Sequence, residues 1–304
     1  DRHAFGDRVD AVDGLADYPF DRRWVDVPAG DGQRLRVHLV DARPAGAATA
    51  PVVVMLHGNP SWSYLWRNQT GPLVAAGYRV IAFDRRGFGD SDKPDSGYDY
   101  DTMAGDVRAI VEELNLESAV LVGFSMGGGE VARYVGRYGT DGLAGVVFAA
   151  AVPPFLLKTE DNPGGGLQPG DVQGMKDGLS GDRDGFFAQF SENFFTANGE
   201  LKVDQSVVDN WRKLAADAST DAALACIDAF GTSDFRDDLS KIDVPTLVIH
   251  GDSDGIVPFE VSGKRTAADV KNSKLVVIED GPHGINDSHT DQFNAALLDF
   301  LGSL

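Results

Sequence analysis

Residues 120–130 read V-L-V-G-F-S-M-G-G-G-E, and this stretch decides the fold that the rest of the chain is expected to adopt. Three apolar residues lead into a G-x-S-x-G pattern centred on Ser125, and a helix-compatible segment, 130–138, follows. A sharp strand-to-helix turn strains the backbone of its serine, which is tolerated only where the residues two before and two after lack side chains. Gly123 and Gly127 meet that requirement. The stretch therefore predicts a buried strand, a tight turn that projects the serine hydroxyl, and a helix.

Apolar runs on both sides of this turn repeat the alternation of strand and helix. Continuously apolar segments are typical of parallel strands that are covered on both faces. We expect such strands at 52–56, 78–83, 145–151, 245–251 and 274–278, and helices at 63–76, 100–115 and 291–301. Strands and helices that alternate with short joins predict an α/β fold with a mostly parallel, doubly wound sheet. In such sheets ligands bind at the carboxyl ends of the strands, where Ser125 would lie.

The N-terminal region has a different pattern. Residues 24–27 and 34–40 alternate apolar and polar side chains, and a turn-rich segment separates them. This alternation predicts an antiparallel hairpin with one solvent-exposed face. Residues 1–23 show no sustained period, so we expect them to form a surface arm.

A long insertion interrupts the alternation after residue 152. The segment 153–238 contains no convincing buried strand. Phenylalanines recur in it at helical spacing, at Phe186, Phe187, Phe190 and Phe194. Such a stripe packs against the body or a neighbouring helix, and some of its members are expected to line the substrate cleft. We therefore expect an α/β core in two parts, 1–152 and 239–304, with a helical cap inserted over 153–238.

The charge balance excludes two classes of partner. The chain holds 27 basic and 47 acidic residues, which gives a formal net charge of −20. Such a surface repels nucleic acid and anionic membranes. No apolar run approaches the roughly 18–20 residues that span a bilayer, and residues 1–5 lack the apolar core of a signal peptide, so we expect a cytoplasmic protein. The single cysteine, Cys226, lies in an apolar run, which indicates a buried, inert thiol.

A serine hydroxyl becomes a useful nucleophile only beside a base that an acid orients. In a fold of this kind the acid and the histidine follow the serine in the chain. His283, in the loop after the last expected strand, fits this order best, with His289 as the alternative. Asp252 and Asp254 both follow the preceding strand, and spacing does not decide between them.

Two backbone N–H groups are expected to bind the oxyanion that forms during attack. Met126 supplies one at a helix N-terminus, whose dipole favours negative charge. The second should come from Asn59, in the loop after the strand at 52–56. The aromatic residues expected to line the substrate pocket are Trp62, Phe124, Phe155 and Phe187. The chain contains no H-E-x-x-H sequence and no P-loop, so we expect neither a metal nor another cofactor.

These features together resemble the α/β-hydrolase superfamily over essentially the whole chain. From residue 78 onward the chain is similar to the cofactor-free bacterial haloperoxidases, a family of serine esterases and perhydrolases. The matching segments include A-F-D-R-R-G-F-G-D-S, V-G-F-S-M-G-G-G-E-V-A-R-Y, P-F-L-L-K-T-E-D-N-P, I-D-V-P-T-L-V-I-H-G-D-S-D and G-P-H-G. The family's H-G-x-x-D pattern implies Asp254 as the acid and leaves Asp252 as a turn residue. The resemblance also implies the roles given above to Ser125, His283, Asn59 and Met126.

The N-terminal part is similar to a different family, the haloalkane dehalogenases. The segments L-A-D-Y-P-F, R-V-H-L-V-D and H-G-N-P-S-W-S-Y-L-W-R-N carry this resemblance. In those enzymes the residue at Asn59 contributes a side-chain amide to the departing halide, and the nucleophile is Asp where this chain has Ser125. An alkyl group transferred to serine would form an ether, which has no acyl carbon for water to attack. We therefore reject dehalogenation.

The sequence thus predicts a serine-dependent carboxylic ester hydrolase that acts on a small ester or acid through an acyl-enzyme. Haloperoxidase relatives usually have Trp at the position of Asn59, which predicts a different acyl pocket. Pro60 follows, as in those relatives, and the family associates this proline with perhydrolysis. Perhydrolysis is therefore expected as a second activity. The alternatives are a lactam or amide hydrolase of the same fold and a non-catalytic protein that binds a small ligand under the cap.

Overall fold

The computed structural model describes residues 20–30 and 32–304. The surface arm expected at 1–23 lies outside the described residues up to position 19. Its last three residues, 21–23, are not part of an arm, because strand β1 (Asp21–Gly30) begins there. This strand pairs antiparallel with β2 (Gln33–Ala42), so the hairpin expected from the alternating pattern is confirmed.

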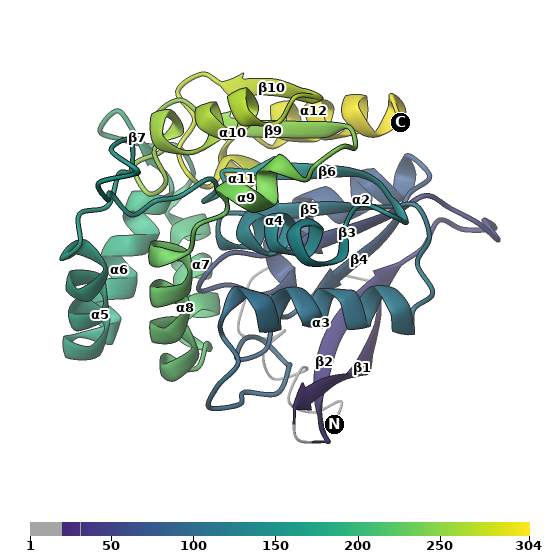
Figure 1. Cartoon of the computed structure of the whole chain (residues 1–304), viewed down its shortest axis with the longest axis horizontal. Helices are drawn as coiled ribbons and strands as arrows, with labels where there is room; N and C mark the ends of the chain where they lie inside the picture. Colours follow the sequence, from purple (N-terminus) through teal and green to yellow (C-terminus); the bar gives the residue numbers. More distant parts are fainter. Residues whose placement is uncertain (1–19, 31) are drawn as a thin grey trace.

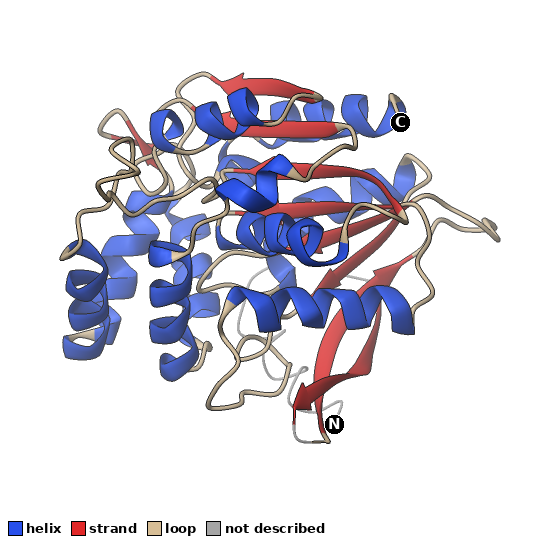
Figure 2. Cartoon of the chain, in the orientation of Figure 1, coloured by secondary structure: helices blue, strands red, loops and turns tan. Residues whose placement is uncertain are grey.

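A mostly parallel sheet of eight strands forms the centre of the fold (Figure 2). Its order is β1-β2-β4-β3-β5-β6-β9-β10, and the pairs β1–β2 and β2–β4 are antiparallel while the others are parallel. The remaining strands are β3 (Val52–Leu56), β4 (Arg79–Phe83), β5 (Ala119–Phe124), β6 (Leu143–Ala149), β9 (Thr246–Gly251) and β10 (Ser273–Ile278). The predicted fold class and each predicted strand are therefore confirmed.

One strand is less buried than its sequence indicated. The apolar run at 274–278 predicts a strand that is covered on both faces, but β10 lies at the edge of the sheet. Leu275 and Val277 are 40% and 43% exposed. The prediction was wrong on burial because periodicity reports apolar content, whereas position within the sheet is decided by the order in which strands pair.

Helices cover both faces of the sheet (Figure 1). The helices on one face are α3 (Tyr100–Glu113), α4 (Met126–Tyr138), α9 (Arg236–Ser240) and α10 (Gly263–Asp269). Those on the other face are η2 (Ser63–Trp66), α2 (Arg67–Ala75) and α12 (Thr290–Gly302). Each face buries its own apolar cluster, which is how a doubly wound sheet hides strands that are apolar on both sides. Within the described part of the chain, no helix is both long and apolar enough to cross a membrane.

Four helices of the insertion lie together at one end of the sheet, at the left of Figure 1. They are α5 (Asp171–Gly181), α6 (Arg183–Phe194), α7 (Gln205–Ala216) and α8 (Thr220–Thr232), with two short strands, β7 (Thr196–Ala197) and β8 (Glu200–Leu201), between α6 and α7. The phenylalanine stripe lies on α6, and its Phe190 and Phe194 rings pack on Trp211 of α7 with centroids 5.6 and 4.9 Å away. The stripe therefore joins neighbouring helices, as expected. The cap boundaries, 153 and 238, remain predictions.

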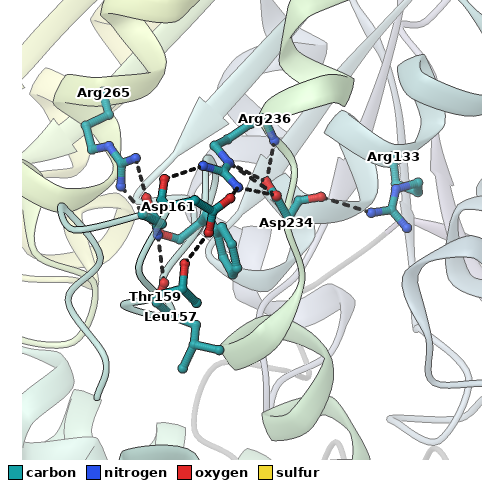
Figure 3. A network of polar contacts seen from close by, with 9 residues as sticks. Arg133, Leu157, Thr159, Asp161, Asp234, Arg236 and Arg265 are labelled. Carbon is teal, nitrogen blue, oxygen red and sulfur yellow. Dashed lines mark hydrogen bonds and ion pairs between the residues drawn. The ribbon is translucent and has the colours of Figure 1, made fainter. Parts of the chain in front are cut away.

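The segment that leads from the sheet into the insertion is fastened by a polar network (Figure 3). The Asn162 side chain is 1% exposed, and its Nδ2 donates to the carbonyls of Phe155 and Leu157 at 3.1 and 2.7 Å. Arg265 Nη2 of α10 donates to Asn162 Oδ1 at 2.8 Å. A more exposed part of the network joins Arg236 to Asp161 at 2.9 Å. The buried part holds two backbone carbonyls of the segment, while the more exposed Arg236 binds the side chain of Asp161 and, at 3.0 Å, its carbonyl.

Two substitutions separate the buried and exposed parts of this network. Asn162→Ala removes the hydrogen bonds to the carbonyls of Phe155 and Leu157 and from Arg265 Nη2, so it should lower the free energy of unfolding by about 1–3 kcal/mol. Arg236→Ala should cost clearly less, because exposed ion pairs are screened by water and salt. Urea denaturation followed by circular dichroism compares them. An equal or larger loss of unfolding free energy in Arg236→Ala would contradict the conclusion that the buried part of the network contributes more to stability.

Candidate active site

Ser125 sits at a strained turn between β5 and α4. Its backbone angles are φ 53° and ψ −118°, a left-handed conformation that L residues rarely adopt. The turn is held by Ser125 N–H, which donates to Ala149 O at 2.9 Å, and by Ser125 O, which accepts from Val152 N–H at 3.2 Å. The glycines of the pattern permit the close approach. A Cβ at Gly123 would lie 2.4 Å from Gly127 O, and one at Gly127 would lie 2.6 Å from Leu56 O.

Helix α4 begins at Met126, four residues before the start that the sequence indicated. Glycines at 127–129 are weak helix formers, so propensity alone places the start at residue 130. Packing explains why the glycines are helical. A Cβ at Gly128 would meet Ala151 Cβ at 2.3 Å, and one at Gly129 would meet the Tyr100 ring at 2.5 Å. The lack of side chains at Gly128 and Gly129 lets the N-terminus of α4 pack directly against Ala151 and Tyr100.

The structure brings His283 and Asp254 together beside this turn. His283 Nδ1 lies 2.7 Å from Asp254 Oδ2, and both side chains are buried. Asp254 Oδ1 accepts from the backbone N–H groups of Ile256 and Val257 at 2.9 and 2.8 Å. Each carboxylate oxygen therefore has a partner, which fixes the orientation of the carboxylate toward the imidazole.

Asp254 is held in its charged form. Burial alone would raise the pKa of its carboxyl, but the charge of His283 and the hydrogen bonds from His250 and His283 hold that pKa well below its usual range. His250 Nε2 lies 3.3 Å from Asp254 Oδ2 and 2.7 Å from Val257 O. Sequence reasoning missed the contact of His250 with the acid. Because His250 lies in β9 and Asp254 follows in a turn, helical spacing could not indicate this contact.

The other sequence candidates occupy different places. Asp252 accepts from Asp280 N–H at 2.9 Å and from Ser253 Oγ at 2.8 Å, which is the turn role that the resemblance implies. His289 precedes α12, and its Nδ1 lies 2.7 Å from Ser288 Oγ. Cys226 is fully buried, and burial raises the pKa of its thiol to about 12, as expected for an inert thiol.

The His283 ring packs between two phenylalanines, one of which precedes Ser125. Its ring centroid lies 5.0 Å from that of Phe124, the residue that precedes the serine. On another side it meets Phe194 edge-on at 4.9 Å, and Gly284 N–H donates to Phe194 O at 2.9 Å. The histidine loop is therefore held between the end of β5 and the end of α6.

An apolar cavity of about 240 Å³ opens beside the serine. Asn59, Ser125 and Met126 form part of its wall. The rest comes from five segments distant in the chain and includes Leu156, Leu167, Met175, Phe190, Phe230, Ile256 and Val261. A small cavity lined mainly by apolar side chains suits a short acyl or alkyl group.

The four aromatic residues expected in the pocket are not among the residues that line this cavity. The Trp62 ring stacks on Tyr64, and Phe124 packs on His283. Phe155 lies under the Arg236 guanidinium, and Phe187 lies under that of Arg183. Of the phenylalanine stripe, Phe190 reaches the cavity. These four residues were expected in the pocket because they are aromatic. Which side chains line the cavity is instead decided by how the insertion folds over the sheet.

Gly123→Ala tests the close approach at the turn. The added methyl meets backbone, which has no rotamer to change, so α4 must shift away from the sheet. We expect a loss of about 1–3 kcal/mol in the free energy of unfolding. Gly71, within α2, has nothing within 4 Å of an added Cβ, so Gly71→Ala is the matched control and should be neutral or slightly stabilising. Equal thermal unfolding curves for the two variants would contradict the prediction.

Asp254→Asn tests the charge of the buried acid. The carboxyl pKa is lower in the folded chain than in the unfolded chain, so its contribution to stability is present above about pH 4 and is lost as the pH falls toward the folded-state pKa. Wild type should exceed the variant in free energy of unfolding at about pH 7, and the difference should shrink below about pH 4. Urea titrations across that range measure it. A difference that grows in acid would contradict the assignment.

Comparison with known proteins places this site in a family. A profile of the alpha/beta hydrolase fold matches residues 51–290. The putative non-heme chloroperoxidase of Synechocystis sp. is 47% identical over 252 residues, which cover 82% of this chain and 90% of the relative. The bifunctional esterase/perhydrolase of Acinetobacter calcoaceticus is 41% identical over 260 residues, which cover 85% and 94%. A haloalkane dehalogenase of Mycobacterium marinum is 42% identical over 142 residues, 46% of each chain.

The fold is shared with crystal structures of the same group. A bromoperoxidase from Bacillus anthracis superposes with a TM-score of 0.87 at 45% identity, covering 93% of this chain and 100% of that one. The two resemblances that the sequence motifs carry, to haloperoxidases and to haloalkane dehalogenases, are both confirmed by relatives of those names. The strained serine turn, the mostly parallel sheet and these matches together show that the chain belongs to the α/β-hydrolase family.

Proposed function

We propose that this protein is a serine-dependent carboxylic ester hydrolase that works through an acyl-enzyme. Ser125 Oγ attacks the acyl carbon, His283 takes the hydroxyl proton and returns it to the leaving alcohol, and Asp254 holds the imidazole in one tautomer. The observation that carries the proposal is the 2.7 Å contact between His283 Nδ1 and Asp254 Oδ2, with the ring packed on the residue before Ser125. Nδ1–H donates to Asp254, which leaves Nε2 as the base.

The oxyanion of the tetrahedral intermediate is bound, in this proposal, by the backbone N–H groups of Asn59 and Met126. Both residues line the cavity together with Ser125. Met126 is the first residue of α4, so its N–H points out of the positive end of the helix dipole. One such donor typically lowers the barrier by about 3–4 kcal/mol.

Water or hydrogen peroxide then releases the acyl group. The attacking oxygen adds to the acyl carbon, its proton passes to His283, and the serine oxygen leaves with that proton, which gives an acid or a peracid. The esterase/perhydrolase name of the Acinetobacter relative supports both outcomes. The mainly apolar cavity supports an acyl group of a few carbons.

Ser125→Ala should abolish hydrolysis of p-nitrophenyl acetate, with a loss of about 10⁴-fold or more in kcat. A fluorophosphonate probe should label the wild type and fail to label this variant. Ser253→Ala is the matched control, because Ser253 lies in the turn beside Asp252 and hydrogen-bonds to its carboxylate. Turnover and labelling that persist in a folded Ser125→Ala would contradict the proposed nucleophile.

The same variants test perhydrolysis. With acetate, peroxide and bromide, the wild type should brominate monochlorodimedone and Ser125→Ala should not, because peracid formation passes through the acyl-serine. Bromination by Ser125→Ala at the wild-type rate would contradict this route. Hydrolysis without any bromination would restrict the function to ester hydrolysis.

A further inference from the structure

Arg85 is a buried arginine behind the proposed oxyanion site. Its side chain is 2% exposed and lies just after β4. Nη2 donates to His57 O at 2.5 Å, and Nη1 donates to Gly58 O at 3.2 Å. These are the two carbonyls immediately before Asn59. A planar guanidinium with donors in a fixed fork therefore holds the backbone of this loop at two successive points.

His57 fastens the same loop from its side chain. Its Nε2 accepts from Arg85 N–H at 2.8 Å, so the ring proton is on Nδ1, which donates to Gly58 O at 2.7 Å. Burial and the neighbouring charge of Arg85 lower the pKa of His57 to about 3. The ring therefore stays neutral at working pH, and its two hydrogen bonds persist.

Glu130 completes the arrangement from α4. Its carboxylate is 0% exposed, and Arg85 Nε donates to Oε1 at 2.5 Å. Glu130 lies one helical turn beyond Met126, so the Arg85–Glu130 pair joins the loop that ends at Asn59 to the helix that begins at Met126.

Stability does not account for this pair. Glu130 Oε2 is buried and has no hydrogen-bond partner among the described residues. Burial raises the pKa of this carboxyl to about 7, against the opposing effect of Arg85. Buried ion pairs are often no more stabilising than apolar side chains of the same volume. An apolar pair in the same place could not make the directed hydrogen bonds by which Arg85 holds the loop.

We propose that Arg85 and Glu130 are positioning residues that set the separation and direction of the Asn59 and Met126 N–H donors. This inference rests on the proposed function, since it assigns the pair to the oxyanion site of that reaction. The pair does not contact the substrate. It acts by fixing the loop to the helix, so its loss should weaken binding of the transition state more than binding of the ester.

The adjacent residue provides an internal control. Arg86 is also 2% exposed, and its Nε and Nη2 donate to Asp106 of α3 at 2.7 and 2.8 Å. Its remaining hydrogen bond, from Nη1, goes to Ser96 O. The chain thus has two neighbouring buried arginine–carboxylate pairs, of which Arg85–Glu130 contacts the loop before Asn59.

The test compares Arg85→Met/Glu130→Leu with the control Arg86→Met/Asp106→Leu. Each double variant removes a whole buried pair, so neither leaves an isolated buried charge. With p-nitrophenyl acetate, the first variant should lose about tenfold to a hundredfold in kcat with KM within about threefold, because a small misplacement of donors affects the transition state. Its affinity for phenylboronic acid, which forms a tetrahedral adduct with serine, should fall in parallel. The control should keep both values near those of wild type.

The activities of the wild type and the two double variants decide between the inference and the proposed function. An active wild type with an equally active Arg85→Met/Glu130→Leu variant overturns the inference alone, as does a control that loses kcat to the same extent. An inert wild type overturns the proposed function and the inference with it. If the double variant does not fold, Arg85→Lys replaces it, because an ammonium cannot serve two carbonyls and a carboxylate in the same fork. It should lower kcat with KM retained, and an unchanged kcat would overturn the inference.

Discussion

The close contact between the first turn of α4 and the end of β3 is the constraint on which the site depends. Gly127 packs so tightly that a single methyl group there would lie 2.6 Å from Leu56 O. This contact fixes where Ser125 leaves the sheet and where Met126 starts the helix. It also places the loop after β3 beside the helix N-terminus. The strained backbone at Ser125 is maintained because packing on both sides of the turn allows no other path.

Much of the fold could be predicted from the sequence, because its buried strands are continuous apolar runs. The strand at 52–56 agrees with β3 residue for residue, and the others agree to within two residues at most ends. Propensity failed where packing decided the outcome. The glycines at 127–129 form the start of α4 because their neighbours lie too close for a side chain. The edge position of β10 depends on strand order, which periodicity does not report.

The site was predictable in part for a similar physical reason. Chain order and the strand ends predicted Asp252 or Asp254 near His283, and the family resemblance implied Asp254; the structure has the Asp254 and His283 side chains in contact. The cavity lining was not predictable, since it is built by segments around Leu156, Phe190 and Ile256 that meet only after the insertion folds back. The ion-pair partners of Arg85 and Arg86 were not predictable either. The two residues are identical and adjacent, so the sequence does not indicate which carboxylate each of them binds.

The residue at the turn also decides between two chemistries within one family. The chain shares sequence with a haloalkane dehalogenase and with haloperoxidases. In the proposed function, a serine at position 125 forms an ester only from an acyl donor, and the N–H groups of Asn59 and Met126 stabilise an oxyanion only at a carbonyl carbon. We therefore propose that turnover passes through an acyl group on Ser125.

Rapid acid quench of the enzyme during turnover of p-nitrophenyl acetate, followed by mass spectrometry of its peptides, detects such an acyl-enzyme. We expect an added acetyl group on the peptide that contains Ser125, at a level that rises within the first turnover and disappears when the ester is exhausted. Steady turnover with no acetylated peptide, or with the acetyl group on another residue, would contradict it.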